Sequence, residues 1–444
     1  GRSRASTNHR RRSWKSASTT NPAAPEIEID KAFISFRIGV SLWARQERFE
    51  ELLADIEEGG DAKAMEYAEK FDRYTGNLVV TREEIEDARA SFLNDAAFAH
   101  ARLGDFQRAR TYWEAGMKIG VYRDLAVGVN GSGPEAWADR ELYTPRASIG
   151  APPDPLALQG QDWGMPPMRP DVLRERAYQP FIDLLRGNMG TGGALRIDHV
   201  MMLYRLWWVA AGRPPGEGTY VYYDLDALMG ILALESQRHR CLVIGEDLGT
   251  VPEAIRHAMD DFGIYSYRVF YFEHDEQGAP RRPASYPERA LVTVSTHDLP
   301  PLASFWRSSD IELRGRLGLY PDEQTRAGTV SFRRHQLESI LEALRDTGLY
   351  AVADSGEEDS GRPVSPALAE AIQVYLASSR ARMMVVQPED WLLMEDPVNV
   401  PGTSDEHANW QRKLTVNLEA WLESDETRRL AGRISAARKT VPAH

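Results

Sequence analysis

Residues 241–249 read CLVIGEDLG, a short apolar run that ends at Glu246. Two other runs end in the same way, at Asp198 and at Asp298. They are ALRIDHV (194–200) and ALVTVSTHDL (290–299). Continuous apolar runs of this length are typical of parallel strands that are buried on both faces. The sequence therefore predicts three such strands, each followed by an acid at its carboxyl end.

Three more short runs are mainly apolar, as these predicted strands are. They are KIGVYRDLAVGV (118–129), YSYRVFYFE (265–273) and ARMMVVQPEDWL (381–392). Amphipathic stretches with helical periodicity lie between the runs, at 172–187, 225–239, 252–263 and 332–348. Six strand and helix units in a row favour a (β/α)8 TIM-type barrel of the α/β class, with an open doubly wound sheet as the alternative.

The chain before this region has a different character. Residues 26–117 have a helical pattern, which predicts a helical segment ahead of a barrel region at 118–444. Residues 1–25 carry six Lys or Arg and no acid. We interpret them as a disordered basic tail, with a transit segment or a nucleic-acid-binding arm as alternatives.

Composition limits the classes of partner and compartment. The 444 residues are 42% apolar, enough for a large core, and the formal net charge of −13 argues against nucleic acid as the main partner. No run of 18 apolar residues occurs, so we expect no membrane span. Cys241 is the single cysteine and opens an apolar run, which predicts a buried reduced thiol and a cytoplasmic protein.

The three strand-end acids fit glycoside chemistry. In a parallel barrel the carboxyl ends of the strands meet at one face, so Asp198, Glu246 and Asp298 are predicted to converge. A retaining enzyme uses one carboxylate as nucleophile and a second as acid/base. Apolar surroundings and neighbouring acids would raise the pKa of Glu246, as an acid/base requires, while Arg196, on the same strand face as Asp198, would keep that acid ionised. Asp247 should point to the opposite face and be structural.

Two other interpretations of these positions stay open. Any single acid at a strand end is often a helix cap or part of an ion pair. The adjacent pairs Asp198–His199 and His297–Asp298 resemble metal ligands, but neighbouring residues of a strand point to opposite faces, so neither pair chelates a metal without a bend.

Aromatic residues near these segments are consistent with a sugar ligand, because indole faces pack on pyranose rings. Trp163 lies in the glycine-flanked loop GQDWG, where exposure at a site is expected, and Trp391 and Trp410 are further candidates. For Trp207 and Trp208, in the apolar run RLWWVAAG, core packing is the better interpretation.

As a set, these motifs resemble the 4-alpha-glucanotransferases, also called amylomaltases, of the alpha-amylase clan. The matching segments are IGVYRDLAVGV, GAPPD, GQDWG, ALRIDHVMMLYRLWW, VIGEDLGTVP, ALVTVSTHDLP, QPEDWL and VPGTSDEHANWQRKL. The resemblance implies that Asp198 is the nucleophile, Glu246 the acid/base and Asp298 the transition-state stabiliser. It also implies further substrate contacts, from Arg196, His297, Asp154, Trp163 and Asn399. The implied reaction passes an α-1,4-glucan segment from one maltodextrin, starch or glycogen chain to the 4-hydroxyl of another, with no metal or organic cofactor.

The resemblance weakens upstream of residue 118, because the family's first two barrel strands are not recognisable there. A barrel without them is incomplete and exposes two sheet edges, unless residues 30–43 supply a substitute strand. The alternatives to a transferase are therefore an α-glucan hydrolase with the same acids, or an inactive truncated homologue that only binds glucan. A tetratricopeptide-like fragment within 81–117 leaves a role in protein interaction as a weaker hypothesis.

Overall fold

A computed structural model describes residues 120–153, 159–190, 192–275, 278–350, 363–403 and 405–440. These residues belong to the unit that spans Leu93–His444. The predicted tail at 1–25, the predicted helical segment at 26–117 and the possible substitute strand at 30–43 lie outside the described residues.

A six-stranded parallel sheet contains all six predicted strands in chain order. Its strands are β1 (Val121–Leu125), β4 (Gly192–Ile197), β7 (Leu242–Gly245), β8 (Tyr265–Val269), β9 (Ala290–Thr293) and β10 (Met383–Met384). Every neighbouring pair is parallel. In the part of the chain that is described, β1 and β10 are the edges and do not pair with each other, so these strands do not form a closed barrel.

Alternate residues of the central strands serve two different cores. Leu195 of β4 and Val243 of β7 join one apolar cluster, which also includes residues of α7 (Gln179–Met189), α8 (Leu225–His239) and α9 (Glu253–Asp261). Ala194 and Ile244 join a second cluster on the opposite face of the strands. Both faces are buried, which explains why the strands appear in the sequence as continuous apolar runs.

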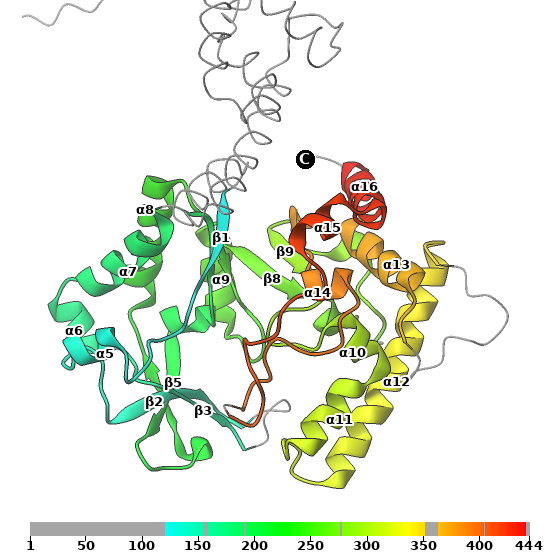
Figure 1. The fold of residues 1–444 in the computed structure, drawn as a ribbon. Helices are drawn as coiled ribbons and strands as arrows, with labels where there is room; N and C mark the ends of the chain where they lie inside the picture. Colours follow the sequence, from blue (N-terminus) through cyan, green and yellow to red (C-terminus); the bar gives the residue numbers. More distant parts are fainter. Residues whose placement is uncertain are drawn as a thin grey trace, which may run out of the picture. The chain divides into compact units, whose positions relative to one another are not determined.

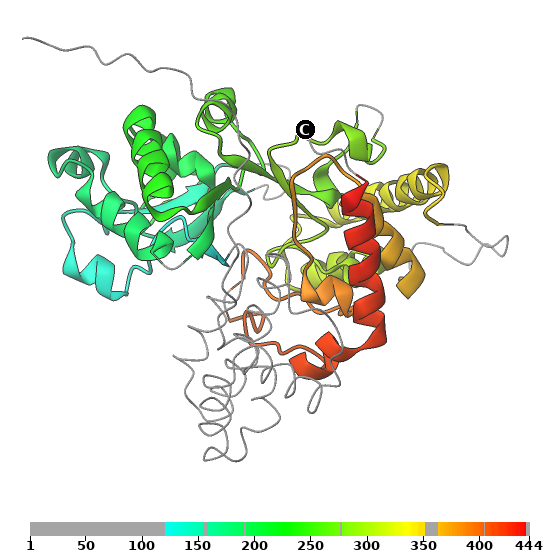
Figure 2. The same cartoon turned by 90° about the horizontal axis from the view of Figure 1, so that it is seen from above.

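Figures 1 and 2 show helices on both sides of the parallel strands. The helices not yet introduced are α5 (Pro134–Ala138), α6 (Pro170–Glu175), α10 (Leu302–Arg307), α11 (Ser309–Arg316), α12 (Glu323–Asp346), α13 (Pro366–Ala377), α14 (Pro388–Trp391), α15 (Leu418–Glu423) and α16 (Asp425–Lys439). Short 3-10 turns are η1 (Val200–Leu203), η2 (Pro215–Glu217), η3 (Phe270–Phe272) and η4 (Pro283–Ser285). The second core lies between β8, β9 and helices α10, α12 and α13.

The single helix predicted at 172–187 is wrong, because the structure has two helices there, α6 and α7. Ala177 and Tyr178 between them have positive φ values of 49° and 59°, a conformation that ends a helix. Pro180 then occupies the first turn of α7, where its missing N–H leaves no helical hydrogen bond unmade.

A second sheet of four antiparallel strands was not predicted from the sequence. Its order is β3 (Gln161–Met165), β2 (Ala147–Ala151), β5 (Arg205–Ala210) and β6 (Thr219–Tyr222). Two of these strands precede β4 and two follow it, so the second sheet is inserted around the β4 unit. The GQDWG segment, predicted as a loop, is mostly strand β3, and the RLWWVAAG run begins with β5.

The expectation of a buried cysteine is met. Cys241 is a free thiol with 2% of its surface exposed. Within the described ranges no helix has the length and apolar character needed to cross a membrane.

Candidate active site

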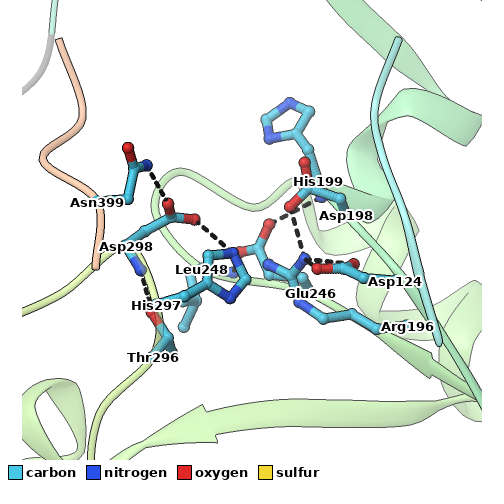
Figure 3. Close-up of polar contacts among 10 residues, drawn as sticks. All are labelled: Asp124, Arg196, Asp198, His199, Glu246, Leu248, Thr296, His297, Asp298 and Asn399. Atoms are coloured by element: carbon cyan, nitrogen blue, oxygen red, sulfur yellow. Dashed lines mark hydrogen bonds and ion pairs between the residues drawn. The ribbon is translucent and has the colours of Figure 1, made fainter. Parts of the chain in front are cut away.

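Three acids lie just beyond the carboxyl ends of parallel strands. Asp198 directly follows β4, Glu246 directly follows β7, and Asp298 lies in the loop between β9 and α10. Arg196 and Ile244 are register partners on neighbouring strands, so Arg196, Asp198 and Glu246 extend from the same face. Figure 3 shows these groups together with His297, Asp298 and Asn399. The structure therefore brings together the three predicted acids and three of the predicted contact residues.

Arg196 is the buried cation of the site, with 6% of its surface exposed. Its Nη1 lies 2.6 Å and 2.8 Å from the two carboxylate oxygens of Asp124 and 2.8 Å from Oδ1 of Asp198. Its guanidinium carbon lies 5.5 Å from the ring centroid of Tyr267. Burial lowers the pKa of Arg196, but the Asp198 and Asp124 carboxylates outweigh burial and hold that pKa above its ordinary value. Arg196 is therefore a fixed positive charge beside the proposed nucleophile.

Glu246 is held by two backbone donors. The N–H of His199 donates to its Oε2 at 2.8 Å, and the N–H of Leu248 donates to its Oε1 at 2.8 Å. Burial, with a further contribution from the charge of Asp198, raises the pKa of Glu246 from 4.5 to about 7, although Arg196 opposes the rise. This agrees with the expected rise. A carboxyl with this pKa exchanges its proton readily at neutral pH, as a general acid/base must.

Asp198 contacts Arg196 as predicted, but its pKa does not follow from that contact alone. Burial raises the pKa of Asp198, and the charges of Asp124 and Asp298 raise it further. The opposing effect of Arg196 is smaller than the sum of these, so the pKa lies above its ordinary value of 3.8. Desolvation of the carboxylate, which depends on the folded surroundings, therefore outweighs the nearby cation.

Asp298 is stabilised in its ionised form by two neighbours. Nε2 of His297 lies 3.1 Å from its Oδ2, and Nδ2 of Asn399 donates to its Oδ1 at 2.7 Å. Burial alone would raise the pKa of Asp298, but the His297 and Asn399 hydrogen bonds and the His297 charge lower it below 3.8. The hydrogen bond with Asp298 is also the largest cause of a raised pKa at His297.

The contact between His297 and Asp298 differs from the sequence expectation that adjacent side chains diverge. Both residues lie past the end of β9, where the N–H of Asp298 turns back to Oγ1 of Thr296 at 3.2 Å. This bend brings the two side chains together. In the ranges that the structure describes, no group of three His, Cys, Asp or Glu gathers in a way that would hold a metal ion.

Asp247 behaves as the structural acid that the strand alternation predicts. It is 3% exposed, accepts the N–H of Tyr267 at 2.9 Å, and pairs with Arg268 at 3.0 Å. It therefore links β7 to β8.

Two tryptophans lie beside the acids. Trp163 of β3 makes an edge contact with the His199 ring, with centroids 5.3 Å apart, and Trp410 lies 5.2 Å from the His297 ring. Trp410 is 62% exposed. Trp391 instead makes an edge contact with Trp421 at 5.9 Å. Asp154, predicted to contact substrate, lies outside the described residues.

Trp207 and Trp208, predicted to pack in the core, are only partly buried. Trp208 packs against the first apolar cluster, whereas Nε1 of Trp207 donates to the carbonyl of Pro215 at 2.9 Å. Core packing thus describes Trp208 better than Trp207.

Sequence reasoning missed Asp124 and Tyr267 as members of the site. A signal for Asp124 exists, since it is an acid inside the apolar run 118–129, and in the structure it lies in β1 as the register partner of Arg196. Tyr267 lies in the middle of β8 and has no comparable signal.

Comparison with known proteins agrees with the family resemblance of the sequence motifs. The family model described as 4-alpha-glucanotransferase matches residues 9–418. The chain belongs to this family. A 4-alpha-glucanotransferase of Haemophilus influenzae is 43% identical over 313 residues, which are 70% of this chain and 44% of that protein. One of Mycobacterium bovis is 40% identical over 305 residues, 68% of this chain and 41% of that protein.

The fold of this member of the 4-alpha-glucanotransferase family is similar to the folds of solved amylomaltase structures. The crystal structure of amylomaltase from Corynebacterium glutamicum has a TM-score of 0.68 and 29% identity, and the match covers 88% of this chain and 56% of that chain. Amylomaltase from Streptococcus agalactiae in complex with acarbose has a TM-score of 0.56 and 16% identity, covering 89% and 74%. The fold is thus mixed α/β with a parallel sheet, similar to amylomaltase, and the chain spans less than half of the length of the two curated relatives.

Proposed function

We propose that the protein is a 4-alpha-glucanotransferase that moves an α-1,4-glucan segment from one maltodextrin to the 4-hydroxyl of another, or to glucose. The observation that carries the proposal is the convergence of the three acids at the carboxyl ends of the parallel strands. Asp198 lies 2.8 Å from Arg196, Glu246 is held by two backbone N–H groups, and Asp298 is held by His297 and Asn399. A carboxylate paired with a cation beside a buried carboxyl whose pKa is about 7 supplies the nucleophile and the acid/base that a retaining reaction needs.

In the first step, an Oδ of Asp198 attacks the anomeric carbon while protonated Glu246 gives its proton to the glycosidic oxygen. The bond between the anomeric carbon and that oxygen breaks, and the reducing-end piece leaves with a free 4-hydroxyl. In the second step, ionised Glu246 takes the proton from the 4-hydroxyl of the acceptor, whose oxygen displaces Asp198. Two inversions give overall retention of the α configuration.

Asp298 carries negative charge that would stabilise the oxocarbenium-like transition state and accept hydrogen bonds from sugar hydroxyls. Its ionised form is supported by His297 and Asn399. Arg196, His297 and Asn399 are proposed substrate contacts on the same side of the sheet, and Asp154 is proposed from the family resemblance alone. Trp163 would offer an indole face to a pyranose ring.

Incubation with maltotriose tests this function. A transferase converts it to glucose and dextrins longer than maltotriose, and Asp198→Asn should stop both products. A product set that contains nothing longer than the substrate, with steady release of new reducing ends, would instead identify an α-glucan hydrolase. The two reactions share their first step, so they differ in whether water or a glucan hydroxyl displaces Asp198.

We further propose a cytoplasmic location, because the chain has one cysteine and it is a buried free thiol.

A further inference from the structure

Asp390 is a buried acid that has no part in the chemistry described above. It belongs to the short helix α14 and has 1% of its surface exposed. Its Oδ2 accepts the hydroxyl of Ser295 at 2.6 Å, and its Oδ1 accepts the N–H of Leu302 at 2.7 Å. In the part of the chain that the structure describes, no Lys, Arg or His forms an ion pair with it. An ionisable side chain is seldom kept in such a place without a specific use.

The two donors to Asp390 mark the ends of one loop. Ser295 comes two residues after the end of β9, and Leu302 is the first residue of α10. The residues between them include His297 and Asp298, the second of which is the proposed transition-state stabiliser. One carboxylate therefore closes both ends of the loop that carries these two side chains.

This closure bears directly on the bend at His297 and Asp298. In an extended chain the two side chains would point to opposite sides, yet they meet at 3.1 Å. Because Ser295 and Leu302 both donate to one carboxylate, the two ends of the loop lie close together, and the chain between them has to turn. The bend thus depends on Asp390, which lies 92 residues after Asp298 in the sequence.

Helix α14 is also connected to the segment that carries Asn399. Glu389, the neighbour of Asp390, pairs with Arg412 at 3.2 Å. The N–H of Trp410, two residues before Arg412, donates to the carbonyl of Val398 at 2.9 Å, next to Asn399. Because Asn399 donates to Asp298, the helix supports this acid from two directions.

We propose that Asp390 is a positioning residue for glycosyl transfer, which holds the 295–302 loop so that Asp298 faces the reacting sugar. The inference rests on the proposed function of Asp298. Asp390 is proposed to act only through the loop and not by contact with substrate. Burial raises its pKa to about 6, against the effect of its two hydrogen bonds, so it is mainly ionised at neutral pH and can accept from both donors at once.

The test compares Asp390→Ala, Asp390→Asn and Ser295→Ala in the full chain. Asp390→Ala removes both acceptors and should lower kcat for maltotriose by about 10- to 100-fold, since a displacement of about 1 Å costs up to that much. Its KM should change less than its kcat, because Arg196 and Trp163, the proposed substrate contacts outside this loop, keep their places. Asp390→Asn should lower kcat less than Asp390→Ala does, since the amide can accept the N–H of Leu302 and donate to the hydroxyl of Ser295. Ser295→Ala keeps the carboxylate and the Leu302 bond, and so serves if Asp390→Ala fails to fold.

Glu235→Gln is the matched control. Glu235 is also 1% exposed and pairs with Arg186 at 3.0 Å, between α7 and α8, without contact to the loop. It should leave kcat per folded molecule and KM unchanged. Equal losses of kcat in Glu235→Gln and in the Asp390 and Ser295 variants would overturn the proposal, because they would reflect a general loss of stability.

A second measurement does not depend on turnover. The His297 pKa, followed by NMR and assigned by the resonance lost in His297→Gln, should fall toward its ordinary value in Asp390→Ala and Ser295→Ala as the contact with Asp298 loosens. It should not move in Glu235→Gln. Wild-type kcat with an unshifted His297 pKa in the loop variants refutes the positioning role. If the wild type transfers no glucan, the proposed function fails, and the His297 shift alone then decides whether Asp390 positions the loop.

Discussion

Replacing Glu246 by Gln should make the protein more stable relative to wild type as the pH rises, although it should lower the transfer activity. The carboxyl pKa rises from 4.5 to about 7 in the folded protein. At about 1.4 kcal/mol per pKa unit, keeping this carboxylate ionised costs the native state about 3 kcal/mol. The native state binds the proton more tightly than the unfolded chain, so the cost is absent below about pH 4.5, grows as the pH rises, and is complete above about pH 7.

Glu246→Gln has no such cost, so its free energy of unfolding relative to wild type should rise by about 3 kcal/mol between about pH 4.5 and pH 8. Gln cannot accept both the His199 and Leu248 N–H groups, which lowers its stability by a similar amount at every pH. Only the pH-dependent part is diagnostic. Urea unfolding of both proteins at several pH values measures it. Glucan transfer should fall by about 100- to 10,000-fold in the same variant.

Glu235→Gln is the control for this experiment as well. The hydrogen bond from Arg186 is the largest cause of a lowered pKa at Glu235. Stability from a lowered carboxyl pKa is complete above the unfolded value and is lost only as the pH falls below it. The difference between this variant and wild type should therefore be flat from about pH 5 to pH 8. If the Glu246→Gln difference is equally flat, Glu246 has an ordinary pKa and the argument for its acid/base role fails.

Three further predictions concern the neighbours of the acids. Arg196→Met should lower the free energy of unfolding in urea by about 1–3 kcal/mol. This is less than the cost of breaking a fully buried pair, because the Asp124 and Asp198 side chains keep 43% and 31% exposure. No measurable loss would show that these acids do not fix the cation. Asn399→Ala should raise the Asp298 pKa and lower kcat by about ten-fold or more, since a hydrogen bond to a charged group contributes about 1.5–3 kcal/mol, and steady-state kinetics with maltotriose checks this. Trp410→Ala should raise KM by about five-fold through lost stacking on sugar, while its unfolding free energy stays within about 0.5 kcal/mol because the side chain is 62% exposed; a change in stability without a change in KM would contradict it.

The parallel sheet could be predicted because its strands are buried on both faces. Val292 and Ile244 have no exposed surface, and such strands are recognisable as apolar runs without any partner being known. The antiparallel sheet gave no such signal. Strand β3 alternates partly buried and exposed residues and contains a glycine, so its sequence resembles a turn.

The same contrast holds within the site. Asp198 and Glu246 follow their strands directly, so topology alone predicts that they converge. Asn399 reaches Asp298 across 101 residues of chain, and the resemblance to a family, not spacing, pointed to it. The raised pKa of Asp198 could not be predicted either, because desolvation depends on everything packed around the carboxylate.

The two backbone donors on Glu246 have a consequence for the reaction cycle. His199 follows β4 and Leu248 follows β7, so this one carboxylate bridges the backbones of two neighbouring strand ends. A carboxyl oxygen that takes up a proton becomes a weaker acceptor, and one of these N–H groups then loses much of its hydrogen bond. Each protonation of Glu246 would therefore loosen the backbone beside the nucleophile or beside Asp247, and each deprotonation would tighten it again. Proton transfer and small backbone movements would then occur in step at the acid/base itself.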